Sequence, residues 1–239
     1  WISNQSPVGL WDNGVTSLAQ NADSKIFVNL MASSSMENTQ MASYDENLIQ
    51  PLENSLKDDA KNKLVFIHMM GSHTQYNKRY PSNFNKFNSA SDSKANIIDS
   101  YDNSILYNDY IIDSIFGGLK EYGMNHPDVR ISALYFSDHG ENVYDEGNYF
   151  GHDYSGDIPH SNVEIPFIFW FSQSQINYLK KSGNFLERDL HTPYMIDDLF
   201  HTIIDLADVR TGCFEPERSF VNSKYNSNRR RILENKRPY

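Results

Sequence analysis

The sequence predicts an α/β fold in which helices cover both faces of a mostly parallel sheet. Residues 63–69 and 129–136 are apolar runs of strand length, and the second alternates and is rich in β-branched and aromatic side chains. Between them, residues 95–122 carry apolar side chains at helical spacing with no proline. A strand, a helix and a strand in this order favour a right-handed parallel crossover, so we expect the two strands to run in the same direction.

The segments before this unit alternate between loops and short elements. Residues 1–24 are polar and contain Pro7 and two glycines, so we expect a loop with at most one short helix. Residues 25–30 form a candidate strand, and residues 45–57 have the apolar spacing of a helix. Because residues 33–43 are small and polar, we expect a loop there.

The segments after strand 129–136 begin with a long loop. Residues 142–160 show neither helical nor strand periodicity, and long ordered loops are often functional. Residues 163–171 form an apolar strand whose Pro166 places it near an edge or a bulge. Helices are expected at 174–181 and 191–208, followed by a polar tail at 210–239. The arginine run in this tail is expected to be either solvated or part of a domain-docking strand.

Composition excludes several classes of protein. The formal net charge of −10 over 239 residues argues against nucleic acid as a partner, because phosphate backbones are held by concentrated Lys and Arg. No stretch approaches the roughly 20 apolar residues of a membrane helix. The single cysteine, Cys213, excludes an internal disulfide framework. We expect a monomer.

The motif that follows strand 129–136 predicts a metal site. Asp138 and His139 offer a carboxylate oxygen and an imidazole nitrogen, a pair that suits Zn²⁺ or a similar divalent ion. Both can reach one ion only if the chain turns there, and we expect Gly140 to supply that freedom. The alternative is that Asp138 caps a helix and His139 is an ordinary surface residue.

Two further histidines follow strands or lie in the long loop. His73 comes after strand 63–69, and His152 lies within 142–160. Since the carboxyl ends of parallel strands meet at one edge of a sheet, we expect a metal or phosphate site where these loops gather. His160 shares the long loop and is a weaker candidate. Structural roles are expected for the other histidines, namely His68, His126, His191 and His201.

A series of motifs in chain order resembles the bacterial phosphoethanolamine transferases, enzymes of the sulfatase-like branch of the alkaline phosphatase superfamily. The motifs are Phe66 to His73 with Arg79-Tyr80-Pro81, Tyr101-Asp102-Asn103 with Tyr107-Asn108-Asp109, Tyr135 to Glu141, Gly151-His152, and Glu164-Ile165-Pro166-Phe167. The resemblance runs over residues 1–209, so we expect a partial sulfatase-like catalytic domain there, with 210–239 as its polar carboxy-terminal tail.

The resemblance implies a zinc-dependent transfer of phosphoethanolamine. It assigns Asp138 and His139 to the catalytic zinc, and His73 and His152 to a second metal ion or to the phosphoryl group. The implied donor is phosphatidylethanolamine, and the acceptor is a cell-envelope sugar or lipid A. The implied setting is the periplasm, with the domain anchored to the inner membrane through a segment outside this chain.

The chain departs from the family pattern at its start. The nucleophilic Thr and an acidic metal ligand of the family precede the segment where this chain begins, so no catalytic nucleophile is assigned within it. We therefore expect a sheet incomplete at its amino-terminal side and no activity from this polypeptide alone. Two alternatives are a sulfatase-like phosphodiesterase or hydrolase, which uses the same metal scaffold, and a non-catalytic domain that retains the fold.

Overall fold

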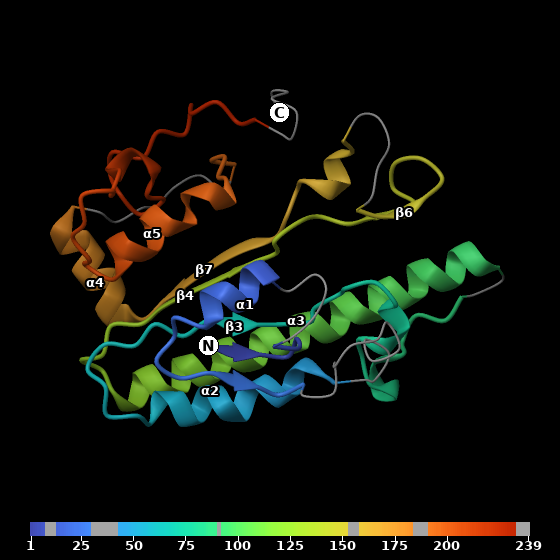
Figure 1. Ribbon diagram of the computed structural model, residues 1–239, viewed down its shortest axis with the longest axis horizontal. Coiled ribbons are helices and arrows are strands. Elements are labelled where there is room, and N and C mark those ends of the chain that lie inside the picture. Colours follow the sequence, from blue (N-terminus) through green and yellow to red (C-terminus); the bar gives the residue numbers. More distant parts are fainter. Residues whose placement is uncertain (8–12, 30–42, 90–91, 153–157, 184–190, 233–239) are drawn as a thin grey trace. The chain divides into compact units, whose positions relative to one another are not determined.

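The computed structural model describes residues 1–239 apart from 8–12, 30–42, 90–91, 153–157, 184–190 and 233–239 (Figure 1). The chain divides into two compact units. Unit 1 comprises Trp1–Tyr122 and His139–Ile165, and unit 2 comprises Gly123–Asp138 and Pro166–Tyr239. Within the described residues, no helix combines the length and the apolarity that a bilayer crossing requires.

Unit 1 contains a three-stranded parallel sheet, in agreement with the predicted α/β class. Strand β1 (Ile2–Ser3) lies between β2 (Ile26–Phe27) and β3 (Ile67–His68) and is parallel to both. The sequence prediction of a loop over 1–24 was wrong at β1. Its two ladder residues give no periodic signal, although Ile2 and Ser3 are only 2% and 1% exposed.

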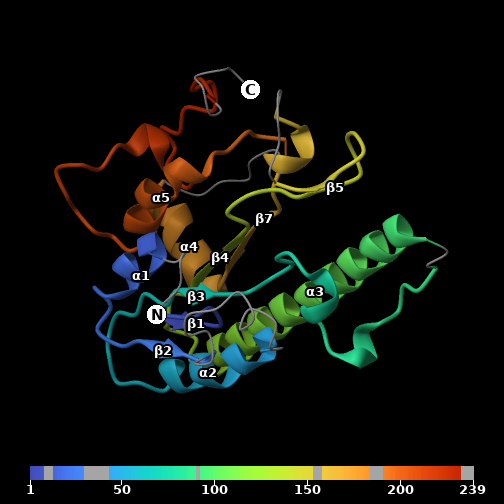
Figure 2. The ribbon, with the colours of Figure 1, turned by 45° about the vertical axis from the view of Figure 1, so that its right-hand side comes forward.

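Three α-helices belong wholly or mostly to unit 1. Helix α1 spans Asn13–Ala19, and α2 (Ile49–Leu56) continues from the 3-10 turn η2 (Asp45–Leu48), as predicted for 45–57. Helix α3 (Ser93–Asn125) is the long helix predicted at 95–122, and α2 lies alongside it in both ribbon views (Figures 1 and 2). Buried side chains of α2 and α3 include Leu52, Tyr107 and Ile111, so the apolar stripe of α3 is core packing.

A hairpin replaces part of the predicted loop 142–160. Strands β5 (Asn142–Val143) and β6 (Phe150–Gly151) pair antiparallel. The buried amide of Asn142 donates to the carbonyl oxygens of Glu146 and Tyr149, and its Oδ1 accepts from the backbone N–H of Glu146. Side chains thus close the turn, and an alternation of apolar residues is not needed. Short 3-10 turns complete unit 1: η3 (Tyr76–Lys78), η4 (Ser82–Phe84) and η5 (His160–Asn162).

Unit 2 is built on an antiparallel pair, β4 (Ser132–Phe136) and β7 (Phe167–Phe171). The predicted parallel crossover from 63–69 to 129–136 is not among the strand pairings of the described residues, where β4 has β7 as its partner. An apolar strand pattern carries no information about direction, and a long connection permits either one.

Helices and the carboxy-terminal segment pack within unit 2. Helix α4 (Gln173–Ser182) matches the prediction at 174–181, whereas the predicted helix 191–208 is reduced to η6 (Ile196–Asp198) and α5 (Leu199–Leu206). After η7 (Pro216–Arg218), the predicted polar tail enters the core: Phe220 is 1% exposed, and its N–H donates to Thr202 Oγ1.

Candidate metal centre

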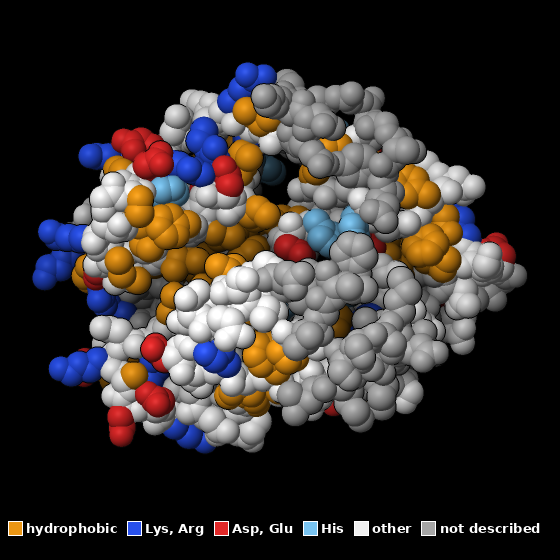
Figure 3. Space-filling model, viewed as in Figure 1, with side chains coloured by type: hydrophobic (Ala, Val, Ile, Leu, Met, Phe, Trp, Pro, Cys, Tyr) orange, Lys and Arg blue, Asp and Glu red, His pale blue; other side chains and the backbone are white. Residues whose placement is uncertain are grey.

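Three side chains of unit 1 could hold one metal ion. His139, Glu141 and His152 each place a ligand atom within 4.8 Å of those of the other two. The side chains of His139 and His152 are each 40% exposed, whereas that of Glu141 is 9% exposed. In the space-filling view, histidine side chains gather beside acidic ones on one face of the molecule (Figure 3). The sequence prediction named His139 and His152 but not Glu141.

The carboxylate of Glu141 joins a buried hydroxyl to an imidazole. Its Oε2 atom lies 2.9 Å from His152 Nδ1, and its Oε1 atom accepts a hydrogen bond from the Tyr76 hydroxyl. Tyr76 is 3% exposed. Burial, and then Glu141 itself, raise the pKa of Tyr76, so the phenol stays protonated and remains a donor.

The Nδ1 atoms of both histidines lie within hydrogen-bond distance of an acceptor. His139 Nδ1 lies 2.7 Å from the carbonyl oxygen of Gly140, which can only accept, so Nδ1 carries the proton. His152 Nδ1 donates in the same way to Glu141. Nε2 is the second ring nitrogen of each histidine, and the two ring centroids are 4.1 Å apart. A histidine held by a carboxylate or carbonyl on its other nitrogen is typical of zinc sites.

Gly140 is required because the backbone approaches it closely. A Cβ atom there would lie 2.2 Å from Ser161 O and 2.9 Å from Glu164 O, and the Gly140 N–H donates to Asn162 O at 3.0 Å. Its φ is not among the positive ones, so the glycine is needed for this close approach and not for a left-handed conformation. The residue joins His139 to the turn η5 instead.

Two buried side chains of opposite charge fix the loop that carries His73. The Asp45 carboxylate, in a residue 5% exposed, accepts from the N–H groups of Met70 at 2.9 Å and Gly71 at 2.8 Å. Arg79, 6% exposed, donates from Nε to His73 O at 3.0 Å and from Nη2 to Thr74 O at 2.7 Å. Burial raises the pKa of Asp45 and lowers that of Arg79.

His73 is an exposed residue, but neighbouring protein groups partly desolvate its imidazole ring. Desolvation lowers the pKa of His73, and the positive charge of Arg79 lowers it further. Glu141 acts on His73 in the opposite direction, and His152 also lowers its pKa. These couplings connect His73 to two members of the cluster, although His73 itself is not in the three-residue group.

The other predicted site residues are outside the three-residue group. Asp138 is exposed and is the last residue of the first segment of unit 2, Gly123–Asp138. It is not part of the three-residue group. His160 is exposed at the start of η5. His68 Nδ1 lies 3.0 Å from Ser3 Oγ, and His201 Nδ1 accepts from the Glu215 N–H, in agreement with structural roles for these two residues.

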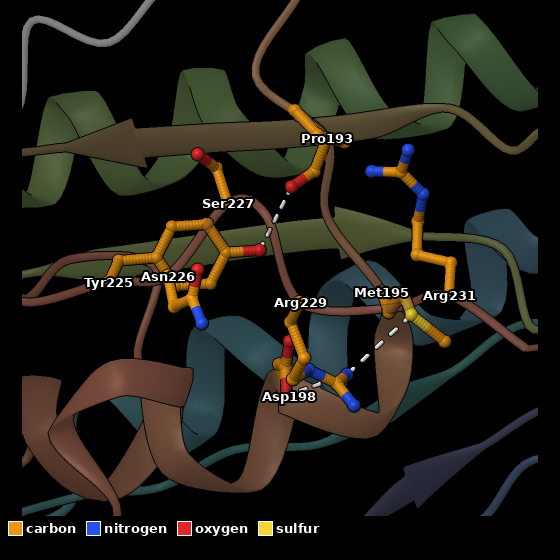
Figure 4. Close-up of a pocket in the computed structure, with 8 residues that line it drawn as sticks. All are labelled: Pro193, Met195, Asp198, Tyr225, Asn226, Ser227, Arg229 and Arg231. Atoms are coloured by element: carbon orange, nitrogen blue, oxygen red, sulfur yellow. Dashed lines mark hydrogen bonds and ion pairs between the residues drawn. The ribbon is translucent and has the colours of Figure 1, made fainter.

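The arginine run at the carboxy-terminal end is partly structural. In unit 2, Arg229 Nη2 lies 2.6 Å from Asp197 Oδ1. It also lies 3.0 Å from Asp198 Oδ1 (Figure 4). Arg231 lines the adjoining pocket, whose volume of about 10 Å³ is enough for about one water molecule. This pocket is therefore too small for a substrate.

Glu141 and Tyr76 are the residues that sequence reasoning missed. Glu141 closes the motif that begins at Tyr135, two residues after His139, and this position was a usable signal. Tyr76 lies five residues beyond Gly71 in a polar loop, and nothing in its spacing points to a carboxylate 65 positions away.

Comparisons with known proteins give a consistent set of relatives. The family described as Sulfatase matches residues 1–209. The chain is 30% identical over 242 residues to the phosphoethanolamine transferase EptC of Escherichia coli, covering 97% of this chain and 40% of that protein. It is 30% identical over 139 residues to the Kdo(2)-lipid A phosphoethanolamine 7''-transferase of Salmonella typhimurium, covering 55% of this chain and 23% of that protein.

A solved structure with a similar fold is the C-terminal periplasmic domain of Escherichia coli EptC in complex with Zn. Its TM-score to this chain is 0.79 at 29% identity, over 95% of this chain and 62% of that one. The chain thus spans less than two thirds of each of these relatives.

Proposed function

Because the chain belongs to the sulfatase family, and within it to the phosphoethanolamine transferases, we propose that it forms part of a zinc-dependent catalytic domain. The reaction is the transfer of phosphoethanolamine from phosphatidylethanolamine to a cell-envelope sugar or lipid A acceptor. The relatives' names supply the transferred group, and for one of them a lipid A acceptor.

The observation that carries this proposal is the shared orientation of His139 and His152. Two imidazoles whose Nδ1 atoms each face an acceptor, grouped with the Glu141 carboxylate within 4.8 Å, fit Zn²⁺, a metal that prefers nitrogen and carboxylate oxygen ligands. The related domain crystallised with Zn supports the choice of metal. One ion or two, or another divalent ion, would suit these donors.

Each residue has a distinct role in this proposal. His139 and Asp138 hold the catalytic zinc, and His152 and His73 face the phosphoryl group or a second ion. Bound zinc acts as a Lewis acid that neutralises charge on phosphoryl oxygens and lowers the pKa of a coordinated hydroxyl. Glu141 orients His152, and Arg79 and Asp45 hold the backbone of the His73 loop in one conformation.

The nucleophile is proposed to lie outside these 239 residues. Phosphoryl transfer through a phosphothreonine requires an activated Thr, and the motifs of this chain correspond to the part of the domain that follows it. Residues 1–209 are then a partial catalytic domain and 210–239 its carboxy-terminal segment. The polypeptide alone is inactive in this proposal.

The setting follows from the relatives. We place the domain in the periplasm as part of an inner-membrane protein, with the anchor in a segment not included in this sequence. The partners are the lipid donor and the sugar or lipid A acceptor, without nucleic acid, and the domain acts as a monomer.

Zinc content per chain tests the metal centre. We would purify the polypeptide without chelator and compare it with His139→Ala and His152→Ala, using His126→Ala in unit 2 as the matched control. We expect near-stoichiometric zinc in the parent and the control, and loss of zinc in the two site variants. Equal zinc in all four proteins would contradict the assignment.

Activity is tested on a polypeptide extended upstream. With phosphatidylethanolamine as donor, we expect phosphoethanolamine on a lipid A acceptor and none when the 239-residue chain is used alone. Release of free ethanolamine phosphate to water would favour the related hydrolase. A zinc-free extended protein would indicate a non-catalytic domain.

A further inference from the structure

A second hollow lies in unit 1, lined by residues that the metal centre does not use. Its volume is about 400 Å³, in the range of small-molecule sites. Its walls are the irregular segment around η4, the first turns of α3 and the ring of Tyr44. The segment and the first turns of α3 lie side by side in both ribbon views (Figures 1 and 2).

The wall of this hollow is held in place by a buried asparagine. Asn103, 0% exposed, accepts from the N–H groups of Lys86 at 2.7 Å and Phe87 at 2.9 Å. Its amide donates to Phe87 O at 2.9 Å and to Asn85 Oδ1 at 3.1 Å. The segment is therefore fixed to α3 before any ligand arrives, which lowers the entropy cost of binding.

Several amides line the hollow without being used for this attachment. Among the described residues, none hydrogen-bonds to the side-chain amides of Asn77, Asn88 or Asn96. Each offers two N–H donors and one carbonyl acceptor. Because exposed amides ordinarily bond to water, the informative feature is their gathering around one concave surface.

Charge excludes an anionic ligand here. Among the described residues that line the hollow there is no Lys or Arg, and the one charged group is Asp99, 8% exposed. Both Asp99 oxygens are already engaged by Ser89, with Oδ2 2.6 Å from its N–H and Oδ1 2.9 Å from its Oγ. A phosphate would meet a negative field and no cation, so a neutral ligand fits better.

Aromatic rings complete the lining. Phe87, 45% exposed, and the rings of Tyr44 and Tyr80 border the same hollow. Amides bond to hydroxyl groups, and the flat face of a ring packs against C–H groups. From this combination we propose that the hollow binds a neutral sugar residue, at a site separate in its residues from the metal centre. The proposal does not depend on the transfer reaction.

The test uses the 239-residue chain and two uncharged sugar probes, methyl β-glucopyranoside and N-acetylglucosamine. We expect at least one probe to bind in the millimolar range and to shift the side-chain amide NMR signals of Asn77 and Asn88. Asn88→Ala, and Phe87→Leu, which keeps an apolar side chain but removes the flat ring, should each weaken binding about tenfold. Both side chains are exposed, so the fold should tolerate these changes.

Asn54→Ala, on the exposed surface of α2, is the matched control and should leave sugar binding unchanged. Absence of any shift with both probes would overturn the proposal, as would equal binding by Phe87→Leu, Asn88→Ala and the parent. Binding of ethanolamine at these amides in preference to the sugars would also overturn it, because the hollow would then recognise an amine. None of these outcomes depends on zinc or on transferase activity.

Discussion

The Tyr76 hydroxyl donates a hydrogen bond to Glu141, a residue 65 positions further along the chain. The other oxygen of that carboxylate bonds to His152, so a buried phenol is connected through Glu141 to a candidate zinc ligand. Tyr76, which is outside the three-residue group, thus helps to hold the carboxylate that orients His152, and such supporting hydrogen bonds are common around zinc.

Tyr76→Phe removes the hydroxyl and keeps the ring. Glu141, whose side chain is 9% exposed, then loses one partner, and we expect the free energy of unfolding to fall by about 1–3 kcal/mol. Zinc affinity should fall as well, since the carboxylate is less firmly held. Urea unfolding and competition with a chelator measure the two effects. Tyr178→Phe, whose hydroxyl bonds to Asp208 in unit 2, is the control and should leave zinc affinity unchanged.

Glu141→Gln keeps the shape of the side chain and removes its charge. A carboxamide still accepts through one atom, but it no longer strengthens the His152 imidazole as a ligand. We therefore expect zinc affinity to fall by about 10–100-fold. The exposed Glu121→Gln in α3 should behave as the parent. An unchanged affinity in Glu141→Gln would show that Glu141 neither orients nor holds a ligand.

Gly140→Ala places a methyl group 2.2 Å from Ser161 O, where backbone must move. We expect a loss of about 3 kcal/mol in the free energy of unfolding and weaker zinc binding, because His139 is adjacent. Gly118→Ala in α3 meets nothing within 4 Å and should stabilise the protein by about 0.5–1 kcal/mol. Thermal and urea unfolding of both variants make this comparison, and a neutral Gly140→Ala would contradict the close approach.

Sequence patterns predicted the long elements and missed some of the short ones, namely β1, β5 and β6. Helix α3 has an apolar stripe over many turns, whereas β1 has two ladder residues and the β5–β6 hairpin is closed by the side chain of Asn142. The same limit applies to the site: His139 and His152 could be found as histidines near strand ends. Glu141 closes the same motif and could have been named for that reason, but its grouping with both histidines depends on side-chain geometry, which residue types do not encode.

His73 should make stability depend on pH. Its folded pKa is lowered from 6.5, so as pH falls through 6.5 the unfolded chain takes up a proton before the folded protein does. Stability contributed by neutral His73 is therefore present above pH 6.5 and is lost as pH decreases towards the lowered pKa. NMR titration of the His73 ring should give a midpoint below 6.5, and His73→Gln should reduce the decrease in stability at acid pH. A midpoint at or above 6.5 would contradict the crowding around this ring.

The substitution Arg229→Ala tests whether the carboxy-terminal segment is a solvated tail or packs as part of the folded unit 2. The arginine's guanidinium bonds to Asp197 and to Asp198, whose side chain is 2% exposed, while Arg218 Nε lies 2.6 Å from the same Asp198 oxygen. In Arg229→Ala, Arg218 remains as a partner for the buried carboxylate, so we expect a moderate loss of about 1–2 kcal/mol in the free energy of unfolding.

The adjacent exposed Arg230→Ala is the matched control and should stay within about 0.5 kcal/mol of the parent. Zinc content should be the same in both variants, because neither arginine is among the candidate metal ligands. If Arg229→Ala is as stable as Arg230→Ala, the two ion pairs contribute nothing and the segment behaves as the solvated tail that its charge pattern predicts. Asp197 and Asp198 directly precede α5, and the Phe220 N–H donates to Thr202 in that helix. If Arg229→Ala is less stable than Arg230→Ala by the expected amount, Arg229 therefore belongs to the interactions that hold the buried residues 219–222 in place.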